Sequence, residues 1–218
     1  MGNFLFTSST TTTTVENRVL SFDDQMAAGF YSDEGWGAEP ITKELQVPGD
    51  VIGQIFPHQQ DNISFTAFFG GKPIGHCSAN MWIDFLEKIP GNLNVQNSNV
   101  LASDGTKKFV QLLKAVVLVE ETQLKDFFVL KGIDINKVSH NCGLMVLSEH
   151  KGKGVGTQLV AESDKVLSQE FSANVVETTN AASRRAFEKN GYVEFKSFVL
   201  TLFSIPIEDK YSIMYKIY

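Results

Sequence analysis

The sequence predicts a single mixed α/β domain with helices on the faces of a central sheet, and three observations support this prediction. Residues 63–69 and 74–83 are rich in aromatic and β-branched side chains and flank a Gly-Gly turn, which is typical of a β-hairpin. Apolar residues recur at helical spacing over residues 106–131. Strand and helix patterns then alternate as far as the C-terminus, which indicates a layered α/β architecture.

The other elements follow in chain order from shorter patterns. Residues 15–22 predict a strand, and the two aspartates after it suit the start of a helix. Glycines and a proline then interrupt the chain before a short helix at residues 41–45, and a polar loop is expected over residues 92–105. Further strands are expected at residues 137–147, 173–178, 192–203 and 212–218, and further helices at residues 25–31, from Gly154 onward and at residues 181–190.

Composition excludes several classes of protein. The 218 residues carry 19 Lys and Arg against 25 Asp and Glu, a formal charge of −6, with no basic block that could neutralise phosphates. We therefore expect no nucleic-acid partner. The two cysteines, Cys77 and Cys142, are too few for a disulfide framework and form no CxxC pair, so we expect no metal site.

The N-terminal segment carries no targeting signal that we recognise. Residues 1–14 are polar and low in complexity, and we expect a disordered tail there, followed by a single domain over residues 15–218. A myristoylation motif fails because Phe6 stands where Ser or Thr is needed. Without an apolar run of about 18 residues, no membrane contact is expected. The expected location is the cytoplasm, and the expected state is a monomer or homodimer.

The most informative motif is the glycine-rich turn at residues 151–157, which reads Lys-Gly-Lys-Gly-Val-Gly-Thr between a strand and a helix. Alternate glycines let the backbone approach a ligand, and the helix N-terminus adds positive potential, so the turn is suited to bind an anion. Its spacing matches neither the Walker P-loop nor the dinucleotide-binding fingerprint. A glycine-rich connection without a ligand is the alternative interpretation of this segment taken alone.

Two motifs together resemble those of the GNAT superfamily of acyl-CoA N-acyltransferases. The first is similar to Val-x-Pro-x-x-Arg/Gln-x-x-Gly-x-Gly/Ala and reads Val146, Ser148, Lys151, Gly154 and Gly156 here, with Ser148 and Lys151 departing from it. The second reads Asn180, Ser183, Phe187, Lys189, Gly191 and Tyr192. The resemblance covers residues 63–218. It implies a central, mostly antiparallel sheet with splayed strands, helices on both faces, and acetyl transfer from acetyl-CoA to an amine.

The resemblance also implies where acetyl-CoA binds. Amides of the glycine turn would hold its pyrophosphate, and its pantetheine chain would pair with the backbone of the preceding strand. Phe187 stands where many members have a Tyr that protonates the departing thiolate, but a thiol with a pKa of about 8.5 leaves tolerably without help. The implied cofactor-binding residues are Leu144, Met145, Val146, Lys151, Gly152, Lys153, Gly154, Val155, Gly156, Thr157, Asn180, Phe187 and Lys189.

Acetyl transfer needs a neutral amine. A primary ammonium with a pKa of about 10 costs roughly 4–5 kcal/mol to deprotonate at neutral pH, so a base is expected. The sequence offers four candidates, which are Glu34, Glu39, His140 and Glu177.

A closer resemblance narrows this choice. Glu39-Pro-Ile-Thr, following the Phe-Tyr pair at residues 30–31, resembles a segment of the invertebrate-type arylalkylamine N-acetyltransferases. It implies that Glu39 acts as the base with help from the hydroxyls of Thr179 and Ser183, and that small aromatic ethylamines such as serotonin, dopamine or tyramine are the acceptors. Glu34 also fits the position of the base if the match to Pro40 is ignored.

His140 is a further candidate, because the matching strand of vertebrate relatives carries histidines near the amine. Alternation along a strand predicts that His140 and Cys142 share one face with Leu144 and Val146.

Simpler interpretations stay open. Glu39 could simply be an acidic residue at the start of a helix, and His140 could be a buried core histidine. Glu177 could be a solvated charge at the end of a strand, and Ser183 could be a hydroxyl on a helix face. Another amine, such as a polyamine, an amino acid, an aminoglycoside or a protein amine, is an alternative acceptor, and a non-catalytic acyl-CoA-binding module is an alternative function. The aromatic side chains that could line an acceptor pocket are Phe30, Tyr31, Trp36 and Phe68.

Overall fold

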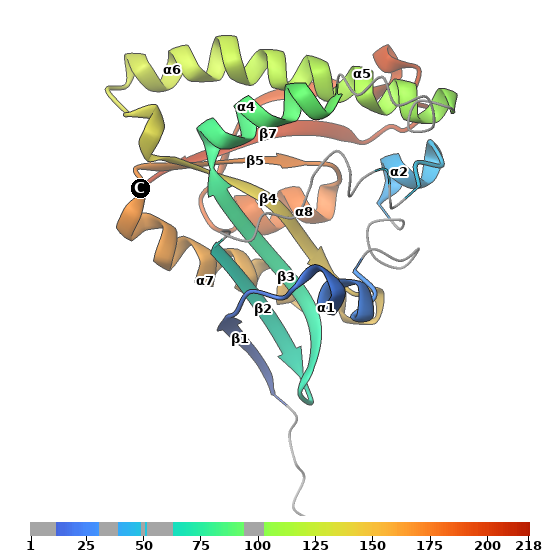
Figure 1. The fold of residues 1–218 in the computed structure, drawn as a ribbon, viewed down its shortest axis with the longest axis vertical. Coiled ribbons are helices and arrows are strands. Elements are labelled where there is room, and N and C mark those ends of the chain that lie inside the picture. Colours follow the sequence, from blue (N-terminus) through green and yellow to red (C-terminus); the bar gives the residue numbers. More distant parts are fainter. Residues whose placement is uncertain (1–11, 31–38, 49–50, 52–62, 94–102) are drawn as a thin grey trace, which may run out of the picture.

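The computed structural model describes residues 12–30, 39–48, 51, 63–93 and 103–218. Seven strands form one sheet in the order β1-β2-β3-β4-β5-β7-β6 (Figure 1). All neighbouring strands are antiparallel except β4 and β5, which are parallel, so the predicted mixed and mostly antiparallel sheet is confirmed. The strands are β1 (Thr13–Asn17), β2 (Ile63–Phe69), β3 (Lys72–Met81), β4 (Val138–Val146), β5 (Ala173–Thr178), β6 (Val193–Val199) and β7 (Lys210–Ile217).

Helices cover both faces of this sheet, as predicted (Figure 1). On β5, Val175 packs into the large core beneath α4 and α5, whereas its neighbour Val176 packs on the opposite face, against α7 and α8. This is the alternation that a pleated strand imposes. The helices are α1 (Phe22–Ala27), α2 (Pro40–Glu44), α4 (Trp82–Leu93), α5 (Asp104–Val119), α6 (Lys125–Leu130), α7 (Val155–Glu170) and α8 (Ala181–Glu188), with a π-helical turn at Glu120–Leu124 and 3₁₀ turns at Ile135–Lys137, Ser148–His150 and Leu200–Phe203.

Two boundaries at the N-terminal end differ from the prediction. Thr13 and Thr14, which we expected in the tail, already belong to β1 and pair with Phe69 and Phe68 of β2. The β-branched threonines suit an edge strand, although their low complexity indicated disorder. β1 also ends at Asn17, five residues earlier than expected.

Helix α4 was not predicted, and the long helix expected over residues 106–131 is interrupted. Pro90 and Gly91 lie in the last turn of α4, and the chain is helical as far as Leu93 although both residues disfavour a helix interior. The π-helical turn Glu120–Leu124 separates α5 from α6 by inserting a wider turn into one continuous helical path. In the part of the chain that the structure describes, no helix combines the length and apolar character needed to cross a bilayer.

Gly105, in the first turn of α5, provides a test of how tightly α5 packs on the end of α2. A Cβ added at Gly105 would lie 1.8 Å from the carbonyl oxygen of Leu45, so the two backbones would have to separate. We expect Gly105→Ala to destabilise the fold by about 1–3 kcal/mol and to lower the Tm accordingly. Gly91→Ala is the matched control, because nothing lies within 4 Å of the added carbon there. Equal melting temperatures for the two variants would contradict this packing.

Candidate active site

The site is centred on the point where β4 and β5 diverge. Their parallel pairing runs from Val138 opposite Ala173 to Asn141 opposite Val176 and ends there. β4 nevertheless continues to Val146 along β3. The backbone of the last residues of β4 therefore faces a gap instead of a neighbouring strand, which confirms the splayed strands that we predicted.

A β-bulge lies on β4 where this gap begins. The register against β3 shifts because Ser78 pairs with Gly143 while the next residue, Ala79, pairs with Asn141. Cys142 is thus the extra residue of the bulge. Since one inserted residue reverses the side-chain alternation, the side chains after the bulge point to the opposite face from that expected.

The prediction that His140 shares a face with Leu144 and Val146 is therefore wrong. His140 stacks on Phe85 of α4, with ring centroids 3.7 Å apart. Leu144 and Val146 instead face α7 and α8, since both side chains lie 3.7 Å from the position of a Cβ at Gly156. The bulge thus directs the histidine toward one face of the sheet and the apolar end of β4 toward the other.

A groove with a volume of about 570 Å³ lies between the end of β4, the glycine turn and α8. Lys153 and Phe187, two predicted cofactor residues, do not line it: Lys153 is exposed, and Phe187 is buried between α7 and β7. The other predicted cofactor residues do line it, namely Leu144, Met145, Val146, Lys151, Gly152, Gly154, Val155, Gly156, Thr157, Asn180 and Lys189.

The glycine turn presents free amides to this groove. Gly152 and Gly154 have φ angles of 76° and 84°, in the left-handed region that glycine tolerates best. Gly154 is the N-cap of α7 and offers no side chain, so the amides at residues 155–157 have no acceptor within the helix. Because Lys151 and Lys189 also line the groove, its charge favours an anionic group such as a phosphate.

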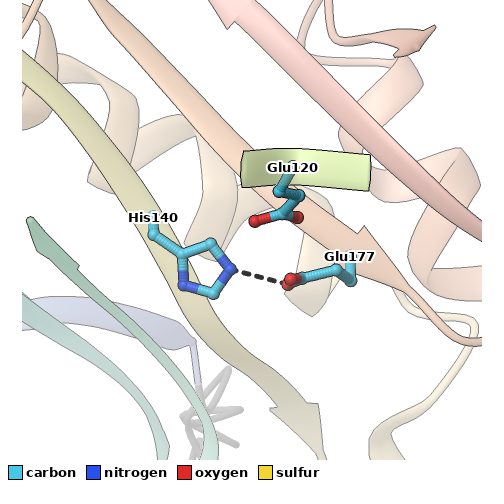
Figure 2. A group of neighbouring side chains, drawn as sticks. All are labelled: Glu120, His140 and Glu177. Carbon is cyan, nitrogen blue, oxygen red and sulfur yellow. Dashed lines mark hydrogen bonds and ion pairs between the residues drawn. The ribbon is translucent and has the colours of Figure 1, made fainter. Parts of the chain in front are cut away.

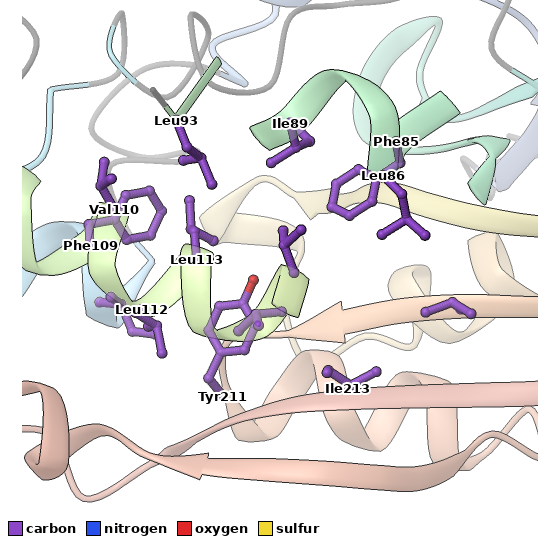
Figure 3. Close-up of a cluster of buried hydrophobic side chains, with 14 of the residues drawn as sticks. Phe85, Leu86, Ile89, Leu93, Phe109, Val110, Leu112, Leu113, Tyr211 and Ile213 are labelled. Atoms are coloured by element: carbon purple, nitrogen blue, oxygen red, sulfur yellow. The ribbon is translucent and has the colours of Figure 1, made fainter. Parts of the chain in front are cut away.

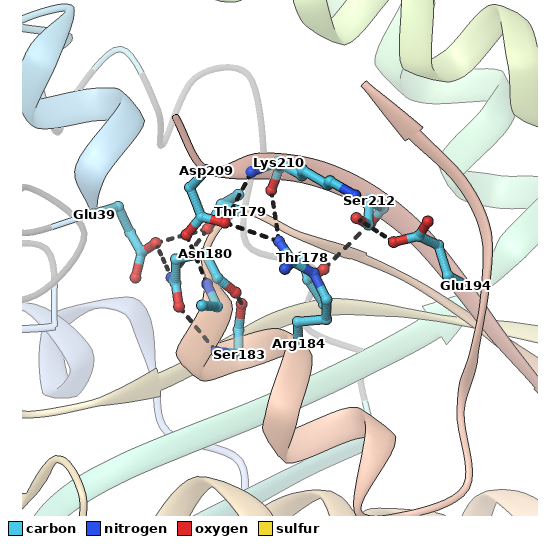
Figure 4. A network of polar contacts seen from close by, with 11 residues as sticks. Glu39, Thr178, Thr179, Asn180, Ser183, Arg184, Glu194, Asp209, Lys210 and Ser212 are labelled. Atoms are coloured by element: carbon cyan, nitrogen blue, oxygen red, sulfur yellow. Dashed lines mark hydrogen bonds and ion pairs between the residues drawn. The ribbon is translucent and has the colours of Figure 1, made fainter. Parts of the chain in front are cut away.

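Glu39 also lines the groove and lies directly before α2 (Figure 4). Thr179 Oγ1 and Asn180 Nδ2 each donate a hydrogen bond of 2.6 Å to its Oε2 atom. Asn180 also caps α8, since its Oδ1 accepts from the Ser183 amide at 2.9 Å. Asp209 accepts from the Ala181 amide at 2.8 Å. Three of the four predicted catalytic residues, Glu39, Thr179 and Ser183, therefore gather at the N-terminus of α8.

A second, inner cavity lies within the gap between β4 and β5 and shares lining residues with the groove, among them Glu39 and Asn180. Phe187 lines this inner cavity rather than the groove. The full lining is Glu39, Phe109, His140, Asn141, Cys142, Gly143, Leu144, Met145, Val176, Glu177, Thr179, Asn180, Ser183, Phe187 and Tyr211.

His140, the fourth predicted catalytic residue, lies at the inner cavity in a buried acidic cluster (Figure 2). Its Nε2 atom is 2.6 Å from Glu177 Oε2, and Glu120 of the π-helical turn lies beside both. Burial raises the pKa of Glu177 to about 7 and raises the pKa of Glu120 well above its usual range, with the Glu177 charge as the next cause. The interpretation of Glu177 as a solvated strand end is wrong.

Sequence reasoning missed Glu120, although a signal was present. Val116, Glu120 and Leu124 follow one another at intervals of four and are all buried. A carboxylate at a position that the helical period assigns to the core needs a partner.

The predicted aromatic acceptor pocket is not assembled from the residues that can be placed. Phe30 stacks on His76 and Phe68 lies under Arg18, and neither lines the groove or the inner cavity. Tyr31, Trp36 and the alternative base Glu34 lie outside the described residues. The aromatic residues that do line the inner cavity are Phe109, Phe187 and Tyr211.

Comparisons with known proteins agree with this geometry. Residues 113–194 match the family model described as an acetyltransferase (GNAT) domain. No curated protein sequence matches the chain. Among solved structures, arylalkylamine N-acetyltransferase 2 from Aedes aegypti matches with a TM-score of 0.72 at 22% identity, over 94% of this chain and 98% of that one.

Two further solved structures are also similar to this chain, and their names give acceptors other than an arylalkylamine. An agmatine N-acetyltransferase matches with a TM-score of 0.65 at 13% identity, over 94% of this chain and 99% of that one. Polyamine N-acetyltransferase from Drosophila melanogaster matches with a TM-score of 0.63 at 12% identity, over 95% of this chain and 100% of that one. At these identities the likeness establishes the fold. The domain match supports an N-acetyltransferase with acetyl-CoA as its cosubstrate, as predicted.

Gly154→Val tests the assignment of the glycine turn to acetyl-CoA. A side chain at this position would obstruct the approach of the backbone to the ligand, so we expect acetyl-CoA affinity to fall by about tenfold or more in calorimetry. The left-handed φ adds strain of about 1–2 kcal/mol. Gly132→Val controls for that strain, because Gly132 follows α6 with a φ of 74° and open space around it. The assignment fails if the two variants bind acetyl-CoA equally well.

Proposed function

We propose that this protein transfers the acetyl group of acetyl-CoA to the primary amine of a small arylalkylamine, with Glu39 as general base. Serotonin, dopamine and tyramine represent the proposed acceptor class. The similarity to the Aedes aegypti arylalkylamine enzyme and the aromatic lining of the inner cavity support this class. We further propose a cytoplasmic enzyme with one domain, which extends the expected range of residues 15–218 back to Thr13 at the start of β1.

The position of Glu39 is the observation on which the proposal rests. Its carboxylate lies where the groove and the inner cavity share their lining, so an amine held there would meet a thioester arriving along β4. Thr179 and Asn180 both donate to Oε2, which leaves Oε1 without a hydrogen-bond partner among the described residues. A carboxylate that is oriented by one oxygen and open at the other is suited to accept a proton.

The remaining predicted residues have supporting roles in this proposal. Thr179 and Asn180 orient Glu39, so Asn180 acts on the acceptor side as well as lining the acetyl-CoA groove. The Ser183 hydroxyl donates to the Asn180 carbonyl at 3.0 Å. Ser183 lines both the groove and the inner cavity, where it can stabilise a polar reaction intermediate. His140 acts through Glu177, which lines the inner cavity.

A polyamine or agmatine-like acceptor is the alternative. Two carboxylates, those of Glu39 and Glu177, line the inner cavity, and neither Lys nor Arg is among its described lining residues. Such a cavity would attract an acceptor with more than one positive charge. The similar folds of the agmatine and polyamine enzymes support the same alternative.

An amine panel at saturating acetyl-CoA, with free-CoA release as the readout, tests the proposed function. We expect tryptamine and phenylethylamine to exceed spermidine and agmatine in kcat/KM, because aromatic rings line the cavity beside the oriented carboxylate of Glu39. The reverse order would favour the polyamine alternative. Acetyl-CoA binding without CoA release from any amine would instead indicate a non-catalytic acyl-CoA-binding module.

Glu39→Gln tests the base. We expect kcat/KM to fall by about 10²–10⁴-fold, the usual effect of losing a general base, while acetyl-CoA affinity stays unchanged. Higher pH should partly restore the rate, because solvent then supplies more neutral amine. Glu44→Gln, at an exposed position of the same helix, should match the wild type. Near-normal turnover of Glu39→Gln combined with a lower Tm would mean that Glu39 is only structural.

A further inference from the structure

The chemistry of amide formation leaves one proton without an assigned acceptor. A primary ammonium carries three N–H protons and its acetamide carries one, so the nitrogen must lose two protons in each turnover. Glu39 accounts for one of them under the proposed function. The inner cavity that Glu39 lines also contains a second carboxylate, that of Glu177.

Glu177 is held in place by two buried groups from different elements (Figure 2). His140 of β4 approaches its Oε2 atom through Nε2 at 2.6 Å, and the His140 side chain is only 1% exposed. Glu120 is fully buried behind the pair, with Trp82 Nε1 donating to its Oε2 at 2.9 Å. These contacts fix the direction of the Glu177 carboxylate, which is itself 10% exposed and lines the cavity.

Burial and the nearby Glu177 charge raise the pKa of Glu120 well above its usual range, which favours its protonated form. Its Oε1 atom is buried and accepts no hydrogen bond from a described residue, which would be costly for an ionised oxygen. As a carboxylic acid, Glu120 can donate a hydrogen bond to Glu177, and such a bond would lower the pKa of Glu177 against the larger effect of burial. Glu177 then remains the titrating carboxyl, with a pKa of about 7, where a general base is most effective.

Groups from three further positions face this cluster, on β7, β4 and α4. Tyr211 of β7 lines the same cavity, and burial raises the pKa of its hydroxyl well above its usual range, so it stays neutral. Cys142 of β4 lies 3.6 Å from His140 Nδ1, and Phe85 of α4 stacks on the imidazole. No Lys or Arg among the described lining residues neutralises the carboxyls. The proton balance is therefore set within the cluster itself.

A shared metal ion fits the distances less well than a shared proton. Ligand atoms about 2.0–2.2 Å from a tetrahedral ion are separated by more than 3 Å. The 2.6 Å between His140 Nε2 and Glu177 Oε2 is instead the separation of a short direct hydrogen bond.

We propose that Glu177 is the second proton acceptor of the acetyl transfer, with His140 and Glu120 as its positioning residues. The inference rests on the proposed function. One N–H proton of the acceptor passes to Glu39 and the other to Glu177: each N–H bond breaks, an O–H bond forms, and the electron pair stays on nitrogen. The nitrogen forms its bond to the thioester carbon as the C–S bond breaks, and the thiolate takes one of the two protons to leave as free CoA. The other proton is released to solvent.

The pH dependence of kcat/KM, measured with the best amine of the panel, tests this inference. In the wild type, kcat/KM should fall as the pH drops below about 7, because Glu177 is then protonated, and this fall is the acidic limb of the profile. We expect Glu177→Gln to lower kcat/KM by about 10–10³-fold and to abolish this limb. Glu120→Gln is the conservative rescue variant and should keep the limb at its wild-type pH, because an amide can donate to Glu177 and accept from Trp82 as the acid does. Glu120→Leu removes that donor, so the limb should move to higher pH. Glu121→Gln, at the exposed neighbouring position, should leave the profile unchanged.

The Tm measured against pH gives a readout that does not depend on turnover. Because the pKa of Glu177 is raised on folding, its contribution to stability is complete below the usual glutamate pKa of about 4.5 and is lost as the pH rises through about 7. The wild-type Tm should therefore decline over this range relative to Glu177→Gln.

Each negative outcome has a separate meaning. Wild-type turnover with an unchanged profile in Glu177→Gln overturns this inference alone, whereas no turnover with any amine overturns the proposed function and this inference with it. An equal shift in Glu120→Gln and Glu120→Leu overturns the positioning role of Glu120. Zinc that stays bound stoichiometrically through dialysis, and that His140→Ala loses, would replace the shared proton with a metal site.

Discussion

The early end of the pairing between β4 and β5 is the constraint on which the rest of the site depends. Only four residue pairs join these strands before they separate, yet both strands lie in the middle of a seven-stranded sheet. The gap leaves room for ligands in what would otherwise be a closed core. It also places side chains from both faces of the sheet around a single cavity, because Glu177 and Phe187 approach it from opposite faces.

The parts of the structure that the sequence predicts well are those specified by neighbouring residues. The β2–β3 hairpin follows from its Gly-Gly turn, and the glycine-rich turn before α7 follows from alternate glycines, two of which have the left-handed φ that this turn requires. Glu39, Thr179 and Ser183 could be named in advance because they belong to short motifs. Their meeting at the N-terminus of α8 depends on tertiary packing across 140 residues of chain, which no local pattern contains.

The predictions that failed depend on partners distant in sequence. The bulge at Cys142 is created by the register against β3, and nothing within β4 itself indicates an extra residue. Helix α4 continues through Pro90 and Gly91 because its apolar residues pack beneath α5, which outweighs the local preference for a break. The buried acidic cluster brings together Glu120 of the π-helical turn, His140 of β4 and Glu177 of β5. Each residue could be recognised separately in the sequence, but their grouping could not.

The gap between the strands also gives this sheet an edge in its interior. The end of β4 beyond Asn141 presents backbone amides and carbonyls on its β5 side with no strand opposite them. Exposed edges of this kind can pair with a strand from another molecule, and proteins usually protect them. Here the groove walls formed by α8 and the glycine turn flank that edge. An extended ligand that fits between them can complete the hydrogen bonding, whereas a second chain would meet these walls.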